Sequence, residues 1–445
     1  MDAPKQGGHR ASIPSHPKEK GLGFRGLADE LGSATWPGVP PRKGVWLYTR
    51  CVHRSLDGCG NRGTSMRAIV MGQVGMEKKP YLEGVRALAG ERGDRVDLYH
   101  IGDIMYGEAP DVPAGTILNL PLSRLNAVRR AAFKDVIAES RGEPNVIVNT
   151  HATFRWRHGL FSAFDFDQVQ KLEPDLLVCL VDNIEMVHHR LHAEHAIDAT
   201  LKDCMVWREE ELLATELLSR AITGTSFYIM ARGRHTTTTR TMYRLVCRPE
   251  MRKVYPSFPM SHVVDMPDVL AEIDAFRAAL AEHFITFDPA DVDEKLLLDR
   301  ALEAARAGNT DQYLDVTPHA FGGSRTADAP LRVRVREVLD IAGDIDGQIY
   351  MRDFRLIDQS DMIVSYIPEL PGQDGKLIPG LSSGVERELQ HAYEHAKEVY
   401  VVWKPAKPPS PFITETSTKI FKTTEEALAY FEQRGMFAQA NLFGQ

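Results

Sequence analysis

From Met66 onward, short apolar runs alternate with longer amphipathic stretches, and this rhythm constrains the fold more than any other feature of the chain. The apolar runs include "RAIVMG", "NVIVNTH" and "DLLVCLVD", and the stretches between them include "YLEGVRALAGE" and "LNAVRRAAFKDVIAES". Continuously apolar strands are buried on both faces, and helices that alternate with them cover both faces of a parallel sheet. The rhythm therefore predicts an α/β domain over residues 66–234, closed by the strand "SFYIMAR".

A second α/β unit begins at "KVYPSFPMSHV", after residues 235–251, which we expect to form a polar connection. The helix "MPDVLAEIDAFRAALAEHF", the strands "DMIVSYIP" and "EVYVVW" and the helix "TTEEALAYFEQRG" follow, and "LRVRVREVLDIAG" is expected to be helical. A chain of 445 residues is long enough for two or three domains. We therefore expect two parallel-sheet α/β domains, the second over residues 252–445.

The segment before Met66 has a different character. Residues 1–65 are rich in Gly, Pro, Arg, Ser and His and have neither helical nor strand periodicity. Such a composition is typical of loops and low-complexity segments. We expect a disordered extension, or an upstream mis-start with Met66 as the natural first residue.

The charge pattern narrows the class of ligand. The net charge is -8, and lysine and arginine form no long block. Because nucleic acid polymers are bound mainly by clustered positive charge, we expect a small-molecule ligand instead. No apolar stretch approaches the roughly 18 residues that span a bilayer, so we expect no membrane contact and a cytoplasmic location. The five cysteines lack CxxC spacing, and we expect no metal site.

The first apolar run leads into Gly72-Gln-Val-Gly75-Met-Glu-Lys78-Lys79 and then a helix. In this context backbone amides and a lysine can hold phosphate, so Gly72, Gly75 and Lys78 are candidate nucleotide-binding residues, with ATP and Mg²⁺ as candidate ligands. Two positions depart from the usual loop. Glu77 stands where a third glycine is usual, and Lys79 stands where a hydroxyl binds magnesium. The alternative is a tight strand-to-helix turn with surface lysines.

Together with "NVIVNTHATFRW" and "VWREEE", this loop resembles the archaeal-type adenylate kinases and the nucleoside monophosphate kinase branch of the P-loop proteins. The resemblance covers roughly residues 66–234. It implies a nucleotide phosphate at the loop, supported by Arg190 or Arg208, unless these arginines pair with acids such as Glu209. In that family the third strand tends to be followed by an aspartate, where this chain has Asn149.

Near the C-terminal end, the stretch "LSSGVERELQHA" joins a Ser-Gly loop to a helix. With Ser383 as N-cap, Glu386 has the spacing of a capping box. Glu388 lies about 200° round the helix from Glu386, so the two carboxylates face different ways. The positive helix end favours an ionised Glu388, and the free amides around Ser382, Ser383 and Gly384 favour a bound anion. An ionised carboxylate beside an anion pocket suits attack on the anomeric carbon of a phosphorylated sugar.

This motif, preceded by "MRDFRLIDQSDMIV", resembles the nucleoside 2-deoxyribosyltransferase superfamily, and within it the 2'-deoxynucleoside 5'-monophosphate N-glycosidases. The resemblance spans about residues 252–445. It implies a flavodoxin-like fold, a homo-oligomer with sites shared across subunits, and no cofactor for glycosyl transfer.

The same resemblance implies residue roles. Glu388 becomes the covalent nucleophile, and Asp353 orients the sugar or assists proton transfer to the base. Tyr255 packs against the deoxyribose. The implied phosphate-binding or hydroxyl-binding turn comprises Ser382, Ser383 and Gly384. One departure is Phe258-Pro259-Met260, where the N-glycosidases have Gly-Ser and a basic residue.

Other interpretations of these residues stay open. Asp353 pairs with Arg352 or Arg355 in one alternative, Tyr255 is ordinary core in another, and Glu388 is a solvated helix residue in a third. Three functions follow: an N-glycosidase or deoxyribosyltransferase acting on a nucleoside or nucleotide, a nucleoside monophosphate kinase, and a non-catalytic nucleotide sensor.

Overall fold

The structure, a computed structural model, describes residues 65–195, 197–233, 237–260, 263–316, 331–372 and 376–437, and these residues belong to one compact unit. The expectation of a disordered extension over residues 1–65 lies outside the described residues, except for Ser65. Among the described residues, no helix combines the length and the apolar character needed to cross a bilayer.

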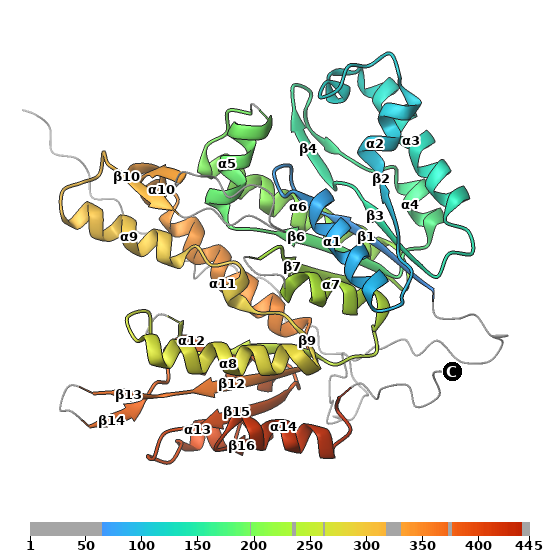
Figure 1. Cartoon of the computed structure of the whole chain (residues 1–445). Helices are drawn as coiled ribbons and strands as arrows, with labels where there is room; N and C mark the ends of the chain where they lie inside the picture. Colours follow the sequence, from blue (N-terminus) through green and yellow to red (C-terminus); the bar gives the residue numbers. More distant parts are fainter. Residues whose placement is uncertain are drawn as a thin grey trace, which may run out of the picture. The chain divides into compact units, whose positions relative to one another are not determined.

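The first sheet has five parallel strands in the order β2-β3-β1-β6-β7 (Figure 1). In chain order the strands are β1 (Met66–Met71), β2 (Asp97–His100), β3 (Asn145–Asn149), β6 (Leu176–Val181) and β7 (Ser226–Ala231). The segments around them are α1 (Lys78–Glu91), α2 (Ile101–Glu108), the short η1 (Ile117–Asn119), α3 (Leu122–Glu139), the hairpin β4 (Thr153–Trp156) and β5 (Gly159–Ser162), α4 (Phe166–Leu172), α5 (Ile184–His195) and α6 (Leu201–Ala221). The predicted parallel α/β architecture is confirmed here.

The second sheet also has five parallel strands, in the order β16-β15-β12-β8-β9. They are β8 (Lys253–Ser257), β9 (Ile285–Thr286), β12 (Met362–Ile367), β15 (Glu398–Trp403) and β16 (Lys419–Phe421). Numbered along the chain and read from β9, the order is 2-1-3-4-5, which is the order of flavodoxin-like sheets. Loops after β8 and β12 leave in opposite directions, so a ligand crevice is expected at this switch point.

The remaining elements come between or after the strands of the second sheet along the chain. They are α8 (Pro267–His283), η3 (Pro289–Asp291), α9 (Lys295–Arg306), the antiparallel pair β10 (Tyr313–Val316) and β11 (Leu331–Arg334), α10 (Val335–Asp340), α11 (Ala342–Asp358), the pair β13 (Glu369–Pro371) and β14 (Leu377–Pro379), α12 (Ser383–Glu394), α13 (Pro411–Thr414) and α14 (Thr424–Gln433). The predicted helix "LRVRVREVLDIAG" therefore begins as a strand. Its first four residues alternate buried and exposed, which is the period of a strand.

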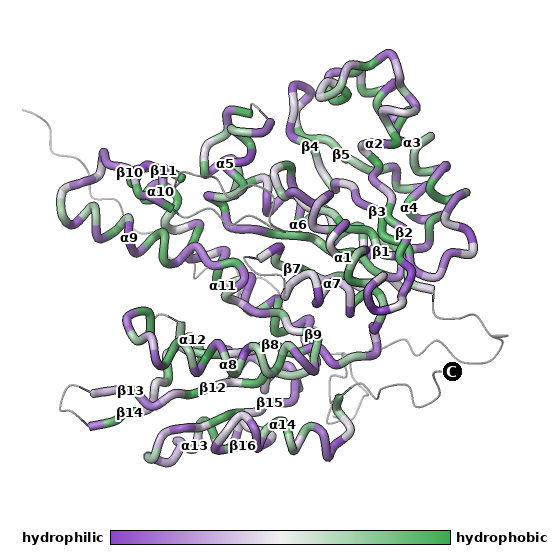
Figure 2. The backbone as a smooth tube through the Cα atoms, viewed as in Figure 1, coloured by the Kyte–Doolittle hydropathy of each residue, from purple (hydrophilic) through white to green (hydrophobic). Residues whose placement is uncertain are grey.

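Apolar side chains cover both faces of each sheet. Side chains of α3 and α4 pack on one face of the first sheet, and α8 and α14 pack on one face of the second. The opposite faces share a continuous cluster with contributions from α1, α7 (Thr237–Cys247), α11 and α12. In Figure 2 the strands of both sheets are drawn mainly as hydrophobic, whereas the helices change character along their length. This pattern is that of sheets buried between amphipathic helices.

The expected polar connection over residues 235–251 is instead largely the helix α7 (Thr237–Cys247). Its apolar side packs in the core, and several of its polar groups are paired, although the Thr239 hydroxyl has no hydrogen-bond partner among the described residues. Tyr81 Oη donates to the Thr238 carbonyl at 2.8 Å, and Arg244 Nη1 donates to the Ala281 and Phe284 carbonyls at 2.6 and 2.7 Å. The run of threonines obscured this helix because threonine has low helix propensity, which tertiary contacts override here.

Candidate functional site

The loop after β1 has backbone conformations that favour glycine. Gly72 has φ 149°, and a Cβ atom there would lie 2.8 Å from the Leu180 carbonyl oxygen. Gly75 has φ 84°, in the left-handed region. Glu77 also adopts a left-handed conformation, with φ 46°, at the position where the usual loop has its third glycine. The chain thus keeps the backbone of a phosphate loop and places a carboxylate on it.

Lys78, the expected phosphate-binding lysine, is buried, and its ammonium donates to the Gly72 carbonyl. His151 Nδ1 lies 3.1 Å from the same ammonium. Burial lowers the pKa of Lys78 to about 8, although Glu211 opposes this shift. Glu211 also accepts the Gly72 amide at 2.9 Å, so the first amide of the loop is already paired.

Glu77 is held by two buried arginines. Its Oε2 accepts from Arg232 Nη2, and Arg190 Nε lies 3.3 Å away. Both arginines also pair with Asp182, at 2.8 Å from Arg190 and 3.3 Å from Arg232. The Glu77 carboxylate therefore lies between the two arginines, where a phosphate group would otherwise be attracted. Arg208, the other expected support, instead pairs with Glu294 at 2.5 Å.

Magnesium does not fit the residues around this loop. Lys79, at the position of the usual magnesium-binding hydroxyl, pairs with Asp103 at 2.6 Å. Asp182, the acid that follows β6, is neutralised by arginines. Neither residue therefore offers Mg²⁺ a free oxygen ligand at its usual position.

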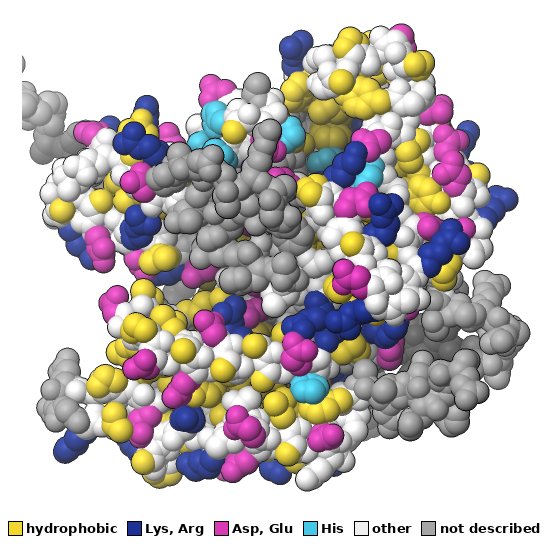
Figure 3. Space-filling view, viewed as in Figure 1, with side chains coloured by type: hydrophobic (Ala, Val, Ile, Leu, Met, Phe, Trp, Pro, Cys, Tyr) yellow, Lys and Arg dark blue, Asp and Glu magenta, His cyan; other side chains and the backbone are white. Residues whose placement is uncertain are grey.

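A cavity of about 560 Å³ opens beside the loop at the carboxyl ends of β1, β2 and β3. Four side chains that line it have buried polar atoms without hydrogen-bond partners in the described part of the chain. These are Gln73 (both amide atoms), His100 (Nε2), Arg129 (Nε and Nη2) and Asn149 (Oδ1). Buried polar atoms are rarely left unpaired, so this wall suits a ligand with donors and acceptors. In Figure 3, histidine, acidic and basic side chains gather over the start of α1 and the neighbouring α2.

Arg129 and Gln73 did not emerge from the sequence as candidates. Arg129 is only 2% exposed on α3, where its Nη1 donates to Asn126 at 2.8 Å. Burial lowers the pKa of Arg129 to about 10. The available signal was an arginine inside the apolar stripe of an amphipathic helix, between Leu125 and Phe133.

In the second sheet, the structure brings Glu388 and Tyr255 together. The Tyr255 hydroxyl donates to Glu388 Oε1 at 3.0 Å, and the Ser257 hydroxyl donates to Oε2 at 2.6 Å. Ser365 on β12 in turn donates to Ser257 at 3.4 Å. Tyr255 is 0% exposed, so its ring is core rather than a surface for deoxyribose, and its hydroxyl positions Glu388. Ser257 was missed, although it lies two residues after Tyr255 on the same strand face.

Glu388 is not held ionised as expected. Burial, followed by the charge of Asp353, raises the pKa of Glu388 to about 8, although hydrogen bonds from Ser257 and Tyr255 oppose the rise. A helix N-terminus contributes about 0.3–1 kcal/mol, less than one pKa unit, and burial outweighs it. Burial also raises the pKa of Asp353 to about 7, against the effect of Arg352. Between them, Glu388 and Asp353 therefore hold at least one proton near neutral pH.

The N-cap of α12 is Ser382 rather than Ser383. Ser382 is buried, and its hydroxyl accepts the Val385 amide at 3.2 Å. Its side chain is thus engaged in capping, and Glu386 is exposed instead of closing a capping box. Ser383 and Gly384 are exposed in the first turn, where a helix cannot pair its own amides.

A buried ion cluster lies beside Asp353. Glu294 is 0% exposed and bonds to Arg208 of α6 at 2.5 Å and to Arg352 of α11 at 3.2 Å. Arg352 also lies 3.9 Å from the Asp353 carboxylate. The cluster joins a helix of the first sheet to the helix that carries Asp353.

Comparison with known proteins supports a P-loop-like fold for the first half of the chain. A family model described as an AAA domain matches residues 85–203, from within α1 to the start of α6. The match includes Arg129 and Asn149 of the cavity and begins after the glycine loop. No curated protein matches the chain. Residues 85–203 are therefore similar to a P-loop, nucleotide-kinase-like AAA domain.

Proposed function

We propose that the first half of the chain binds a nucleoside monophosphate in the cavity beside the loop after β1. The observation that carries this proposal is the convergence of unpaired buried polar atoms of Gln73, Arg129 and Asn149 on one cavity. A guanidinium with two free nitrogens suits a phosphate, and the two amide side chains suit a base or ribose. The cavity volume of about 560 Å³ lies within the usual range for small-molecule sites.

The apolar part of the cavity provides a place for the base. Its lining includes Ile101, Met105, Leu118 and Phe154. Aromatic and aliphatic side chains cover the flat faces of a base, while the polar groups fix its orientation.

Glu77 favours one phosphate over three. A polyphosphate that follows the loop meets the Glu77 carboxylate, which already neutralises Arg190 and Arg232. Repulsion between like charges at short range opposes that placement. The same residues, with Lys79 in place of a hydroxyl, argue for nucleotide binding without efficient phosphoryl transfer.

Thermal unfolding with added ligands tests this proposal. Nucleoside monophosphates are expected to raise the melting temperature of the full chain more than matching nucleosides or triphosphates at equal concentration. Equal shifts for all three, or no shift, would contradict it. Incubation with ATP and a monophosphate tests the kinase alternative, since diphosphate that disappears in Lys78→Ala would establish phosphoryl transfer.

A second function is favoured by a separate observation, the pair of hydroxyl donors on Glu388. We propose that the second half cleaves or transfers the N-glycosidic bond of a 2'-deoxynucleoside or its monophosphate. Tyr255 and Ser257 fix both carboxylate oxygens of Glu388 from the strand at the switch point of the sheet. This anchoring limits the orientation of a nucleophile before substrate binds.

The reaction balances with Glu388 and Asp353 in different protonation states. The Glu388 carboxylate attacks C1' of the sugar, the C1'–N bond breaks, and the base leaves with the bonding electrons. Protonated Asp353 supplies a proton to the base. Water or a second base then attacks C1' and gives up its proton to the Asp353 carboxylate, and Glu388 leaves as a carboxylate.

Chromatography of deoxynucleoside monophosphates incubated with the chain detects free base. Release is expected from wild type and from Glu386→Ala, and not from Glu388→Ala. Equal release from both variants would exclude Glu388 as the nucleophile. Binding of nucleotides with no product in any assay would favour the sensor.

A further inference from the structure

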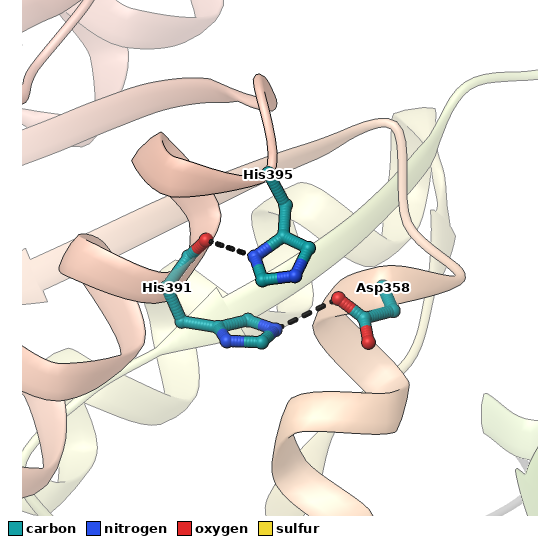
Figure 4. A group of neighbouring side chains, drawn as sticks. All are labelled: Asp358, His391 and His395. Atoms are coloured by element: carbon teal, nitrogen blue, oxygen red, sulfur yellow. Dashed lines mark hydrogen bonds and ion pairs between the residues drawn. The ribbon is translucent and has the colours of Figure 1, made fainter. Parts of the chain in front are cut away.

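Two histidines and an aspartate come together about one helical turn beyond Glu388 and Asp353, on the same two helices. Asp358 is the last residue of α11, His391 lies in α12, and His395 follows the end of α12. One ligand atom from each residue lies within 4.8 Å of the others. Figure 4 shows the two imidazole rings beside the Asp358 carboxylate. Among the described residues, this is the one group of three such side chains with that spacing.

We propose that Asp358, His391 and His395 bind a zinc ion. Two imidazole nitrogens and one carboxylate oxygen are a common zinc ligand set, with water as the fourth ligand. Asp358 and His395 are exposed, so an ion can enter from solvent and keep a water molecule. The sequence expectation of no metal site overlooked the i, i+4 spacing of the histidines, because the third ligand comes from another helix.

The hydrogen bonds indicate which ring nitrogen of each histidine carries a hydrogen. His395 Nδ1 lies 2.8 Å from the His391 carbonyl, which only accepts, so Nδ1 carries the hydrogen and Nε2 keeps its lone pair. Zinc-bound histidines commonly make this second bond to a carbonyl. His391 Nε2 donates to Asp358 at 2.7 Å. For zinc to bind at this nitrogen, a neutral His391 imidazole moves its hydrogen to Nδ1, whereas a doubly protonated imidazole releases one proton to solvent.

Neighbouring groups hold the ligands in place. The His391 ring packs on Phe354, with ring centres 4.4 Å apart. The Lys397 ammonium donates to the carbonyls of Asp358 at 2.7 Å and Ser360 at 2.6 Å, which fixes the end of α11. Little side-chain ordering is therefore left for the ion to impose, which favours binding.

The site joins the two helices that carry the two carboxyl groups of the proposed glycosidase site. α11 carries Asp353, and α12 carries Glu388. A bound zinc ion bridges α11 and α12 and limits their relative movement. The zinc proposal does not depend on either proposed function.

Equilibrium dialysis of the full chain against Zn²⁺ alone tests the site, with metal counted by mass spectrometry. The variants are His395→Ala, which changes an exposed residue, and Asp358→Asn. His192→Ala is the matched control, because His188 and His192 are also four apart on a helix, with Nε2 atoms 3.1 Å apart. Circular dichroism checks that each variant folds.

Wild type and His192→Ala are expected to bind one more zinc ion per chain than His395→Ala and Asp358→Asn. At this site each ligand removal is expected to weaken binding by more than about tenfold. The same zinc content and affinity in all four proteins would overturn the proposal. A loss confined to His192→Ala would also overturn it.

Discussion

The hydroxyl oxygen of Tyr255 and the Oε1 atom of Glu388 lie 3.0 Å apart, and this contact joins β8 to α12. The donation stabilises the ionised form of Glu388 against the larger effect of burial. The first prediction tests this contact.

Tyr255→Phe is expected to raise the apparent pKa of Glu388 by about one unit, because one hydrogen bond to the carboxylate is lost. Base release has a bell-shaped pH profile with limbs near the pKa values of Asp353 and Glu388, about 7 and 8. The variant should move the alkaline limb upward. Tyr400→Phe, also in the buried core, is the matched control. Identical pH profiles for both variants would show that the Tyr255 hydroxyl does not affect the pKa of Glu388.

Glu388→Gln is expected to stabilise the fold at alkaline pH. The folded-state pKa of Glu388, about 8, lies above the ordinary value of 4.5, so ionisation costs the folded state stability as pH rises through this interval. At about 1.4 kcal/mol per pKa unit, the variant should gain up to about 4 kcal/mol relative to wild type between pH 5 and pH 8.5. Urea unfolding at both pH values measures the gain. Glu386→Gln, on the exposed side of α12, should show no such trend.

Glu77→Gly is expected to increase affinity for inorganic phosphate and nucleoside triphosphates by about tenfold or more, because Arg190 and Arg232 lose one of their two carboxylate partners. Glycine also relieves the left-handed backbone, which costs a non-glycine residue about 1–2 kcal/mol. Calorimetric titration measures the affinity.

Glu173→Gly is a matched control for that variant. Glu173 has φ 51° and is exposed at the end of α4, so its replacement gives the same charge change and backbone relief elsewhere. Gains in phosphate affinity of equal size for both variants would show that the loop carboxylate is not the cause.

Glu294→Gln is expected to destabilise the chain by about 3–5 kcal/mol, because Arg208 and Arg352 stay buried without their charge partner. Burial raises the pKa of Glu294, but the two arginines together lower it to about 2. The stabilisation is therefore full above the ordinary pKa near 4.5 and is lost as pH falls towards 2. Thermal unfolding at pH 7 and pH 3 should show a larger loss at pH 7. Exposed Glu303→Gln is the control, and a comparable loss there would contradict the cluster's role.

The sheet architecture was accessible from the sequence because buried parallel strands such as β6 and β12 are continuously apolar. The glycine loop was accessible because Gly72 and Gly75 have backbone angles that favour glycine. Helix α7 was not accessible, since its threonines carry no helical signal, and Thr238 and Thr241 bond to carbonyls outside the helix.

The electrostatics of the two sites were less accessible. The pKa of Glu388 depends on burial and on Asp353, which is distant in the sequence, and no local pattern reveals either. Arg129 requires knowledge of which face of α3 meets the cavity. The choice of Ser382 over Ser383 as N-cap depends on a shift of one residue, which sequence patterns rarely resolve.

Calorimetric titration with AMP and with adenosine tests nucleotide binding in the first half most directly. The proteins are wild type, Arg129→Met and the control Arg130→Met, whose arginine is exposed and pairs with Asp165 at 2.8 Å. Loss of a charged hydrogen-bond donor costs about 1.5–3 kcal/mol, so Arg129→Met should bind AMP at least about tenfold more weakly and adenosine nearly unchanged. Arg130→Met should match wild type. AMP affinity that is equal in all three proteins, or no binding of AMP to wild type, would contradict a nucleotide site in this cavity.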